Sequence, residues 1–466
     1  MKDNVSPRSG VLDCEQGSAT FYEDNFDFRI MNSVPFKATS SSTKDFAKLA
    51  QEDKYFHGTT HDGNDIAIYC GNRIIPAIRT VANFHSNTYA IQKGNLGPCD
   101  WSKIDAIKFS GGTLNLLSAS QDSPFEFVDD AVRTLPPKAP FTFSITHNNS
   151  PIQILIGECA SETYGNDRIE LVGRTQCLTL KFQAPISFGD VHFHIEKIRT
   201  LLSFLTFRQN VCFDEIVLQE RTLPPGFLMD SAVVYSKEPP SPTEKDEFKN
   251  ICFDELGDTI PFLVDLIYNE EKNNPFSFMN FIPKFDNGIG QVTNDMVKGI
   301  VTCLECEIAR LKSLDNITSA IPDNKNDTYI QEEIRLQSLV KELQKVAKDF
   351  QEKNGKFSKK TNDMICGTLK HMSLADADKA NLFYTKYQKL LCKLFERFKI
   401  VPTEDDIKNL IVYRNRTTHG TQDILDERIV VTALYLIGLI YCMILHSIGI
   451  DDQKLEQLCS KHFLLR

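Results

Sequence analysis

Short apolar or alternating runs dominate the first half of the chain, and they end at Gly, Asn, Asp or Pro. These runs predict β-strands at 66–70, 104–109, 141–146, 152–157, 169–173, 177–182 and 213–219. One longer segment, 188–207, has helical spacing and interrupts the strands. Strands at this spacing indicate a sandwich-like or barrel-like sheet.

The apolar spacing changes to the helical period after about residue 255. The pattern predicts helices at 255–273, 292–313, 327–352, 374–397, 403–415, 424–448 and 451–462. Short connections between such helices favour an antiparallel bundle. The lysine-rich segment 353–360, KNGKFSKK, is expected to be a solvated loop.

A segment rich in Pro and charge separates the two patterns. It contains SKEPPSPTEKDEF, and the residue before each proline avoids the helical conformation, so the segment should be extended. We therefore predict an α+β protein whose β-rich, sandwich-like N-terminal domain is followed by an all-α helical bundle. The predicted parts are a flexible arm at 1–23, the β-rich domain at 24–235, a linker at 236–250 and the helical domain at 251–466.

The segment Ile429–Ile450 carries no formal charge over 22 residues and is long enough to cross a bilayer. It also contains Thr432, Gly438 and His446, and it lacks a cluster of flanking basic residues. An apolar helix of this kind can equally form the centre of a soluble bundle. We predict the central helix and no membrane contact, with a tail-anchored membrane protein as the alternative.

Composition narrows the class of protein. The chain has 466 residues, 41% of them hydrophobic, which is enough for two or three globular domains. Its net charge of −10 argues against a broadly basic nucleic-acid surface, although a local basic pocket remains compatible with RNA. Thirteen scattered cysteines and an opening without an apolar leader indicate reduced thiols and a cytoplasmic location.

Two short patterns resemble metal sites. Cys303 and Cys306 form a CxxC, but they lie in a predicted helix without a second pair or a nearby histidine. His192 and His194 have no further candidate ligands either. We expect both pairs to be structural, and we expect no metal and no other cofactor.

The sequence YRNRTTHG, residues 413–420, concentrates groups suited to holding a phosphate. The helix before it has a capping residue, Thr403, followed by three acidic residues that favour a helix N-terminus. Gly420 is expected to close this helix in a left-handed conformation. Arg414 would then project from the last turns, and His419 would lie at the helix exit.

Arg414 and His419 are five residues apart, so on a regular helix they point about 140° away from each other. They converge only if the helix ends between them or if a second copy of the chain supplies the partner group. A guanidinium binds phosphate by a two-point fork, and an imidazole transfers protons near neutral pH. Asn415 adds an amide, and Thr417 and Thr418 add hydroxyls. These groups suffice for metal-free RNA cleavage by the ribose 2′-OH.

Arg414-Asn415-Arg416-Thr417-Thr418-His419 resembles the arginine-to-histidine signature of HEPN domains, a family of helical nucleotide-binding domains that includes ribonucleases. The longer form YRNRTTHG resembles the ApeA-like branch of anti-phage defence proteins, which join a β-rich N-terminal domain to a C-terminal HEPN domain. The position agrees, because the motif follows a helix with a charged start and precedes a long apolar helix.

The resemblance implies a metal-independent endoribonuclease that acts as a homodimer, with both motifs lining one cleft. Arg414 and His419 would be catalytic, with Asn415 as the positioning residue. Contacts to RNA would come from Tyr413, Arg416, Thr417 and Thr418. The process would be abortive infection: a phage-derived trigger sensed by the N-terminal domain switches on cleavage of RNA, with transfer RNA as one candidate target. Products would be a 2′,3′-cyclic phosphate and a 5′-OH.

Other interpretations stay open at this stage. A HEPN domain without catalysis would act as an RNA-binding or dimerisation module in a sensor or scaffold. In that case Arg414 could simply pair with Asp405 or Glu427. Glu305, in the preceding part of the bundle, could assist in the cleft or could form an ordinary salt bridge.

Overall fold

The computed structural model divides the chain into two compact units, one ending at residue 269 and one containing the helices that follow. The structure describes residues 8–14, 17–32, 55–71, 77–78, 81–94, 99–117, 125–128, 131–134, 140–164, 169–222, 227–237, 250–268, 274–283, 292–313, 323–370, 376–418 and 424–464.

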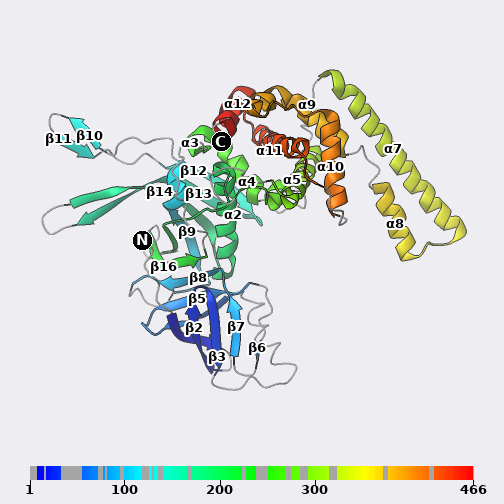
Figure 1. Ribbon diagram of the computed structural model, residues 1–466. Helices are drawn as coiled ribbons and strands as arrows, with labels where there is room; N and C mark the ends of the chain where they lie inside the picture. Colours follow the sequence, from blue (N-terminus) through cyan, green and yellow to red (C-terminus); the bar gives the residue numbers. More distant parts are fainter. Residues whose placement is uncertain are drawn as a thin grey trace. The chain divides into compact units, whose positions relative to one another are not determined.

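The first unit contains a 14-stranded antiparallel sheet (Figure 1), in the order β12-β13-β14-β9-β15-β16-β8-β5-β4-β1-β2-β3-β7-β6. Its strands are β1 (Arg8–Cys14), β2 (Gly17–Asp24), β3 (Asp27–Asn32), β4 (Tyr55–Thr60), β5 (Asp65–Tyr69), β6 (Ala77–Ile78), β7 (Val81–His85), β8 (Thr88–Gln92), β9 (Ile104–Ser110), β12 (Phe141–His147), β13 (Ser150–Tyr164), β14 (Ile169–Ile186), β15 (Glu215–Arg221) and β16 (Leu228–Ser236). A separate ribbon pairs β10 (Phe125–Val128) with β11 (Ala131–Thr134).

The strands near the N-terminus enclose a core of their own. Leu12, Phe21, Phe28 and Ile68 are among its fully buried side chains, and they come from four different strands. Successive side chains of a strand point to opposite faces of the sheet. Apolar residues such as Phe21 therefore face this core, and neighbours such as Tyr22 are exposed.

Helix α2 (Phe188–Thr206) buries its apolar side in the first unit, where it contacts β5 and the 3-10 helix η1 (Gly112–Leu117). The Ser187 hydroxyl accepts a hydrogen bond from the Gly189 N–H at its start. Two short helices, α3 (Phe253–Leu256) and η3 (Gly257–Thr259), lead into α4 (Ile260–Tyr268), which packs on α2 and β12.

The structure confirms the α+β class and the strands expected between residues 66 and 219, but the expected N-terminal arm was wrong. Residues 8–24 are not a flexible arm. They form β1 and β2, in which Leu12 and Ala19 are wholly buried among small and polar residues that conceal the pattern. The pairings β5–β8 and β8–β16 join the described strands into one hydrogen-bonded sheet.

The boundary between the units also differs from the expected linker. Most of 236–250 lies outside the described residues, but Ile251 is buried, and its N–H donates to the Leu205 carbonyl at 3.0 Å. The helix expected at 255–273 is broken into α3, η3 and α4, and these pack in the first unit.

The second unit is helical (Figure 1). Its elements are η4 (Pro275–Phe278), α5 (Asn294–Ser313), α7 (Asp323–Asn354), α8 (Lys359–Lys370), α9 (Asp376–Leu394), η5 (Glu396–Phe398), α10 (Glu404–Thr418), α11 (Glu427–Ser447), α12 (Asp452–Cys459) and a closing π-helical turn η6 (Ser460–Leu464). Helix α11 contacts α5, α9, α10 and α12, so it forms the centre of the bundle.

The central position of α11 agrees with the prediction for residues 429–450. It is the single helix in the described chain that is long and apolar enough to cross a membrane, and 78% of its most apolar window is buried inside the protein. Its apolar surface is therefore used in the bundle core.

Candidate active site

The candidate active site lies on α10, whose N-terminus is capped as the sequence predicted. The Asp406 N–H donates to Thr403 Oγ1 at 3.3 Å, and the Thr403 N–H donates to Asp406 Oδ2 at 2.8 Å. Arg428, near the start of α11, donates to both oxygens of Asp406 at 2.8 and 2.7 Å. This fork holds the pKa of Asp406 well below its usual range and fixes the beginning of α10 against α11.

The expected apolar stripe is also present. Ile407, Leu410 and Ile411 are buried and hold α10 in the bundle. The helix continues to Thr418, beyond the predicted end at residue 415. Arg414 therefore lies in the last full turn of the described helix.

Arg414 extends towards α5, where its Nη2 donates to Glu305 Oε1. The Arg414 side chain is partly buried, with 19% of it exposed, and this burial lowers the pKa of Arg414. Within the described part of the chain, its Nε–H has no hydrogen-bond acceptor. The structure thus gives Arg414 an ion pair with Glu305 instead of with Asp405 or Glu427.

Two residues expected to contact RNA instead stabilise the helix from inside. Tyr413 is buried, and its hydroxyl donates to Asn294 Oδ1 at 2.6 Å, which ties α10 to the first turn of α5. Thr417 is also buried, and its hydroxyl donates to the backbone carbonyls of Tyr413 and Arg414. Both hydroxyls therefore donate their hydrogen bonds to groups within the protein.

The remaining described residues of the motif face solvent. Asn415 and Thr418 are exposed, and the Thr418 hydroxyl bonds to the Arg414 carbonyl at 2.8 Å. Arg416 lines a hollow of about 420 Å³ beside the start of α11, together with Asn409 and Arg428. Arg414 and Arg416 therefore project from different sides of α10, one towards α5 and one towards α11.

His419 and Gly420 lie outside the described residues. The helix that carries Arg414 is described up to Thr418, the residue immediately before His419. The convergence of the imidazole and the guanidinium therefore stays a prediction.

The side chains of the patterns that resembled metal sites contact other groups of the protein. Cys303 is buried on α5 beside the Pro275 carbonyl, and Cys306 is half-buried. His194 is buried against Tyr268, and His192 bonds to Thr88 at 2.9 Å. Among the described residues, no group of three or more His, Cys, Asp or Glu side chains is placed to hold a metal ion.

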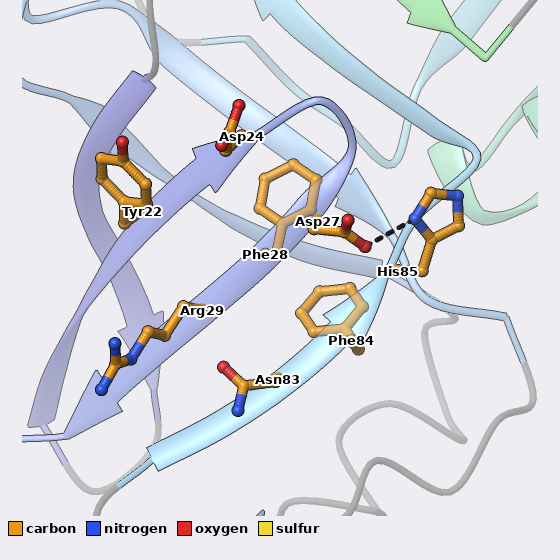
Figure 2. A pocket seen from close by; sticks show the side chains of 8 residues that line it. All are labelled: Tyr22, Asp24, Asp27, Phe28, Arg29, Asn83, Phe84 and His85. Carbon is orange, nitrogen blue, oxygen red and sulfur yellow. Dashed lines mark hydrogen bonds and ion pairs between the residues drawn. The ribbon is translucent and has the colours of Figure 1, made fainter.

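A second group of polar side chains covers strands β2, β3 and β7 in the first unit (Figure 2). Tyr22, Arg29 and Asn83 stand side by side across the three strands. Asp24, Asp27 and His85 form the next row, with His85 Nδ1 and Asp27 Oδ1 2.8 Å apart.

The two rows line a shallow hollow of about 500 Å³. Sequence patterns could not reveal this group, because strand pairing brings β7 beside β3 across a long stretch of chain. Its mixture of acids, a cation and neutral donors could bind a small polar ligand.

No family model, curated protein or solved structure matches this chain. The assignment of a function therefore depends on the motif and on the geometry of α10.

Proposed function

We propose that this protein is a metal-independent HEPN-type endoribonuclease of anti-phage defence, with its active centre at the C-terminal end of α10. The observation that carries the proposal is the placement of Arg414. Its side chain is 19% exposed and is paired with Glu305, and its buried Nε–H lacks an acceptor in the described chain. A partly buried cation held in place by a carboxylate is suited to stabilising a phosphoryl oxygen.

The chemistry uses the nucleophile of the substrate. His419 removes the proton of the ribose 2′-OH, and the 2′-oxygen attacks the adjacent phosphorus. Arg414 stabilises the charge that develops on the non-bridging oxygens. The P–O5′ bond breaks, and the departing 5′-oxygen takes a proton from an imidazolium. The products are a 2′,3′-cyclic phosphate and a 5′-OH, and DNA is spared because it has no 2′-OH.

The assembly that best suits this chemistry is a homodimer in which two motifs share one cleft. Asn415 follows Arg414 directly, Thr418 lies four residues after Arg414, and both are exposed and could face such a cleft. Asn415 would position the histidine or the phosphate, and Arg416 would hold a neighbouring phosphate of the RNA. The polar group on β2, β3 and β7 is a candidate site for the trigger that activates the enzyme in a cytoplasmic setting.

The Arg414–Glu305 pair also suits a second function. An arginine with a carboxylate partner can be purely structural, and the protein would then be a non-catalytic HEPN module that binds RNA or dimerises. The two functions differ in whether Arg414 and His419 are needed for RNA cleavage.

RNA ends from phage-infected cells test the proposal. Cells expressing the wild-type protein should accumulate new 5′-OH and 2′,3′-cyclic phosphate ends during an infection against which the protein protects. His419→Ala and Arg414→Ala should abolish these ends, and Arg397→Ala, an exposed arginine outside the motif, should not. Identical ends with wild type and His419→Ala would refute the enzyme. With purified active protein, EDTA should leave cleavage unchanged.

A further inference from the structure

The helical unit contains a well-defined hairpin made of α7 and α8, which lie side by side (Figure 1). The turn between them was expected to be a solvated loop, but it is stabilised by specific hydrogen bonds. Gln351 Nε2 donates to Asn362 Oδ1 at 3.1 Å across the turn. Ser358 accepts the Thr361 N–H at 3.2 Å and so caps α8. Gly355 has a φ of +96°, which a residue with a side chain would rarely adopt.

Residues 335–360 of this hairpin are strongly basic, although the protein is acidic overall. Residues 335–360 carry eight exposed basic side chains against three exposed acidic ones, a surplus of five positive charges. The basic residues are Arg335, Lys341, Lys345, Lys348, Lys353, Lys356, Lys359 and Lys360. The whole chain has a net charge of −10, so its other surfaces would repel a polyanion. This basic surface would attract it.

Exposed aromatic surface lies among these lysines. Phe350 on α7 is 52% exposed, and its ring is stacked on that of Phe357 in the turn, with centroids 5.8 Å apart and planes at 15°. Lys353 and Lys356 lie between the two rings in the sequence. Proteins bind single-stranded nucleic acid with this combination, because bases stack on aromatic rings while lysines contact phosphates.

We propose that the tip of the α7–α8 hairpin binds single-stranded RNA, with a base on Phe350 and phosphates on Lys353, Lys356 and Lys360. The inference rests on the proposed function in that this RNA is the substrate. A second copy of the chain suits the surface less well. In a two-fold contact the same surface meets itself, and two surpluses of five positive charges would repel each other.

The test measures binding of an unstructured RNA oligonucleotide to the full-length His419→Ala protein by fluorescence anisotropy, across a salt series. Phe350→Ala should weaken binding about tenfold, since stacking contributes roughly 1–3 kcal/mol per base. The triple variant Lys353→Gln/Lys356→Gln/Lys360→Gln should weaken binding at least tenfold. It should also reduce the salt slope by about 2, because each phosphate contact to a single strand contributes roughly 0.7.

Matched controls make the same changes elsewhere. Phe262→Ala removes a ring that is 62% exposed on α4, and Lys389→Gln/Lys393→Gln/Lys399→Gln removes three exposed lysines from α9 and the segment after it. Both should bind RNA within twofold of the parent. If the hairpin variants bind as well as these controls, or if the parent binds no RNA, the inference is wrong. A change in oligomeric state or in binding to anionic vesicles, with RNA affinity unaltered, would also overturn it.

The same hairpin substitutions in the catalytically intact protein separate this inference from the proposed function. If RNA is still cut with an unchanged KM, the hairpin inference fails and the ribonuclease stands. If the hairpin binds RNA and no RNA is cut, the ribonuclease fails and the binding surface stands.

Discussion

The Arg414 side chain is both partly buried and paired with a carboxylate. Its burial strengthens its electrostatic interactions, and its ion pair with Glu305 fixes its position. An incoming phosphate must compete with the Glu305 carboxylate for the same guanidinium. Arg414→Ala should therefore cost little stability, about 1 kcal/mol, while abolishing cleavage. Thermal unfolding and RNA end mapping on the same preparation check both parts. An unfolded Arg414→Ala protein would indicate a structural arginine.

Glu305→Gln tests that competition directly. The amide oxygen can still accept the Arg414 hydrogen bond, but the negative charge that repels RNA is gone. In the His419→Ala background, RNA affinity should rise about three- to fivefold, the equivalent of roughly 1 kcal/mol. Glu396→Gln, an exposed acid in the same unit, is the control and should have no such effect. Unchanged affinity in Glu305→Gln would place the RNA phosphate away from Arg414.

The sequence could predict the cap at Thr403 and the apolar stripe of α10, because both depend on neighbours along the chain. It could not predict that Arg414 pairs with Glu305, since the two are 109 residues apart and only packing of α10 on α5 brings them together. Tyr413 was misjudged for the same reason, because its partner Asn294 is equally remote.

His194 should make the first unit sensitive to acid. Burial, together with His147 and Lys197, lowers the pKa of His194 to about 3, so the folded state binds the proton more weakly than the unfolded state. Stability is then complete above the ordinary pKa near 6.5 and decreases as the pH falls towards 3. The loss should be about 4 kcal/mol between pH 7 and pH 3.5.

Chemical denaturation at several pH values measures this loss. The double variant His194→Phe/Tyr268→Phe removes the imidazole and the hydroxyl that bonds to it at 3.2 Å, so no polar group is left unpaired. Its stability should depend less on pH than that of the wild type. Equal pH dependence in both proteins would exclude His194 as the cause.

At the scale of elements, predictions succeeded where the apolar period is long and failed where it is short or interrupted. Helices α5, α9, α10 and α11 each bury a continuous stripe, so their periodicity is clear in the sequence. Strands β1 and β2 contain few apolar residues among Gly, Ser and Asp, and their burial depends on strands that follow much later. The break between α7 and α8 depends on Gly355 and on side-chain bonds to Gln351.

Close packing of α9 on α11 depends on a residue without a side chain. A Cβ at Gly438 would lie 2.8 Å from the Phe395 ring and 3.0 Å from a methyl group of Leu391. Gly438→Leu should push the helices apart and lower the free energy of unfolding by about 2–3 kcal/mol. Gly438→Ala should be nearly neutral, because the ring moves slightly and alanine favours a helix by about 1 kcal/mol. Denaturant titration of both variants measures their free energies of unfolding. Equal values for Gly438→Leu and Gly438→Ala would contradict this prediction.

At the scale of the whole molecule, total charge conceals how charge is distributed. The value of −10 argued against a broadly basic nucleic-acid surface, yet residues 335–360 of the α7–α8 hairpin carry a local surplus of five positive charges. Composition similarly suggested a boundary at 236–250, whereas packing assigns α3 and α4 to the sheet unit. Boundaries follow buried contacts, and a composition change does not report those contacts.

That boundary leads to a prediction for fragments of the chain. Ile260, Leu263, Val264 and Ile267 of α4 are buried, as is Tyr268. Burial of each apolar side chain contributes about 1.5 kcal/mol or more. Removing α4 would therefore cost as much as the whole free energy of unfolding of a typical domain. A fragment of residues 1–269 should therefore unfold cooperatively and remain monomeric, whereas a fragment of residues 1–249 should aggregate and bind a hydrophobic dye. Thermal unfolding and size-exclusion chromatography distinguish the two. If both fragments fold equally well, α4 is not needed for the stability of the sheet unit.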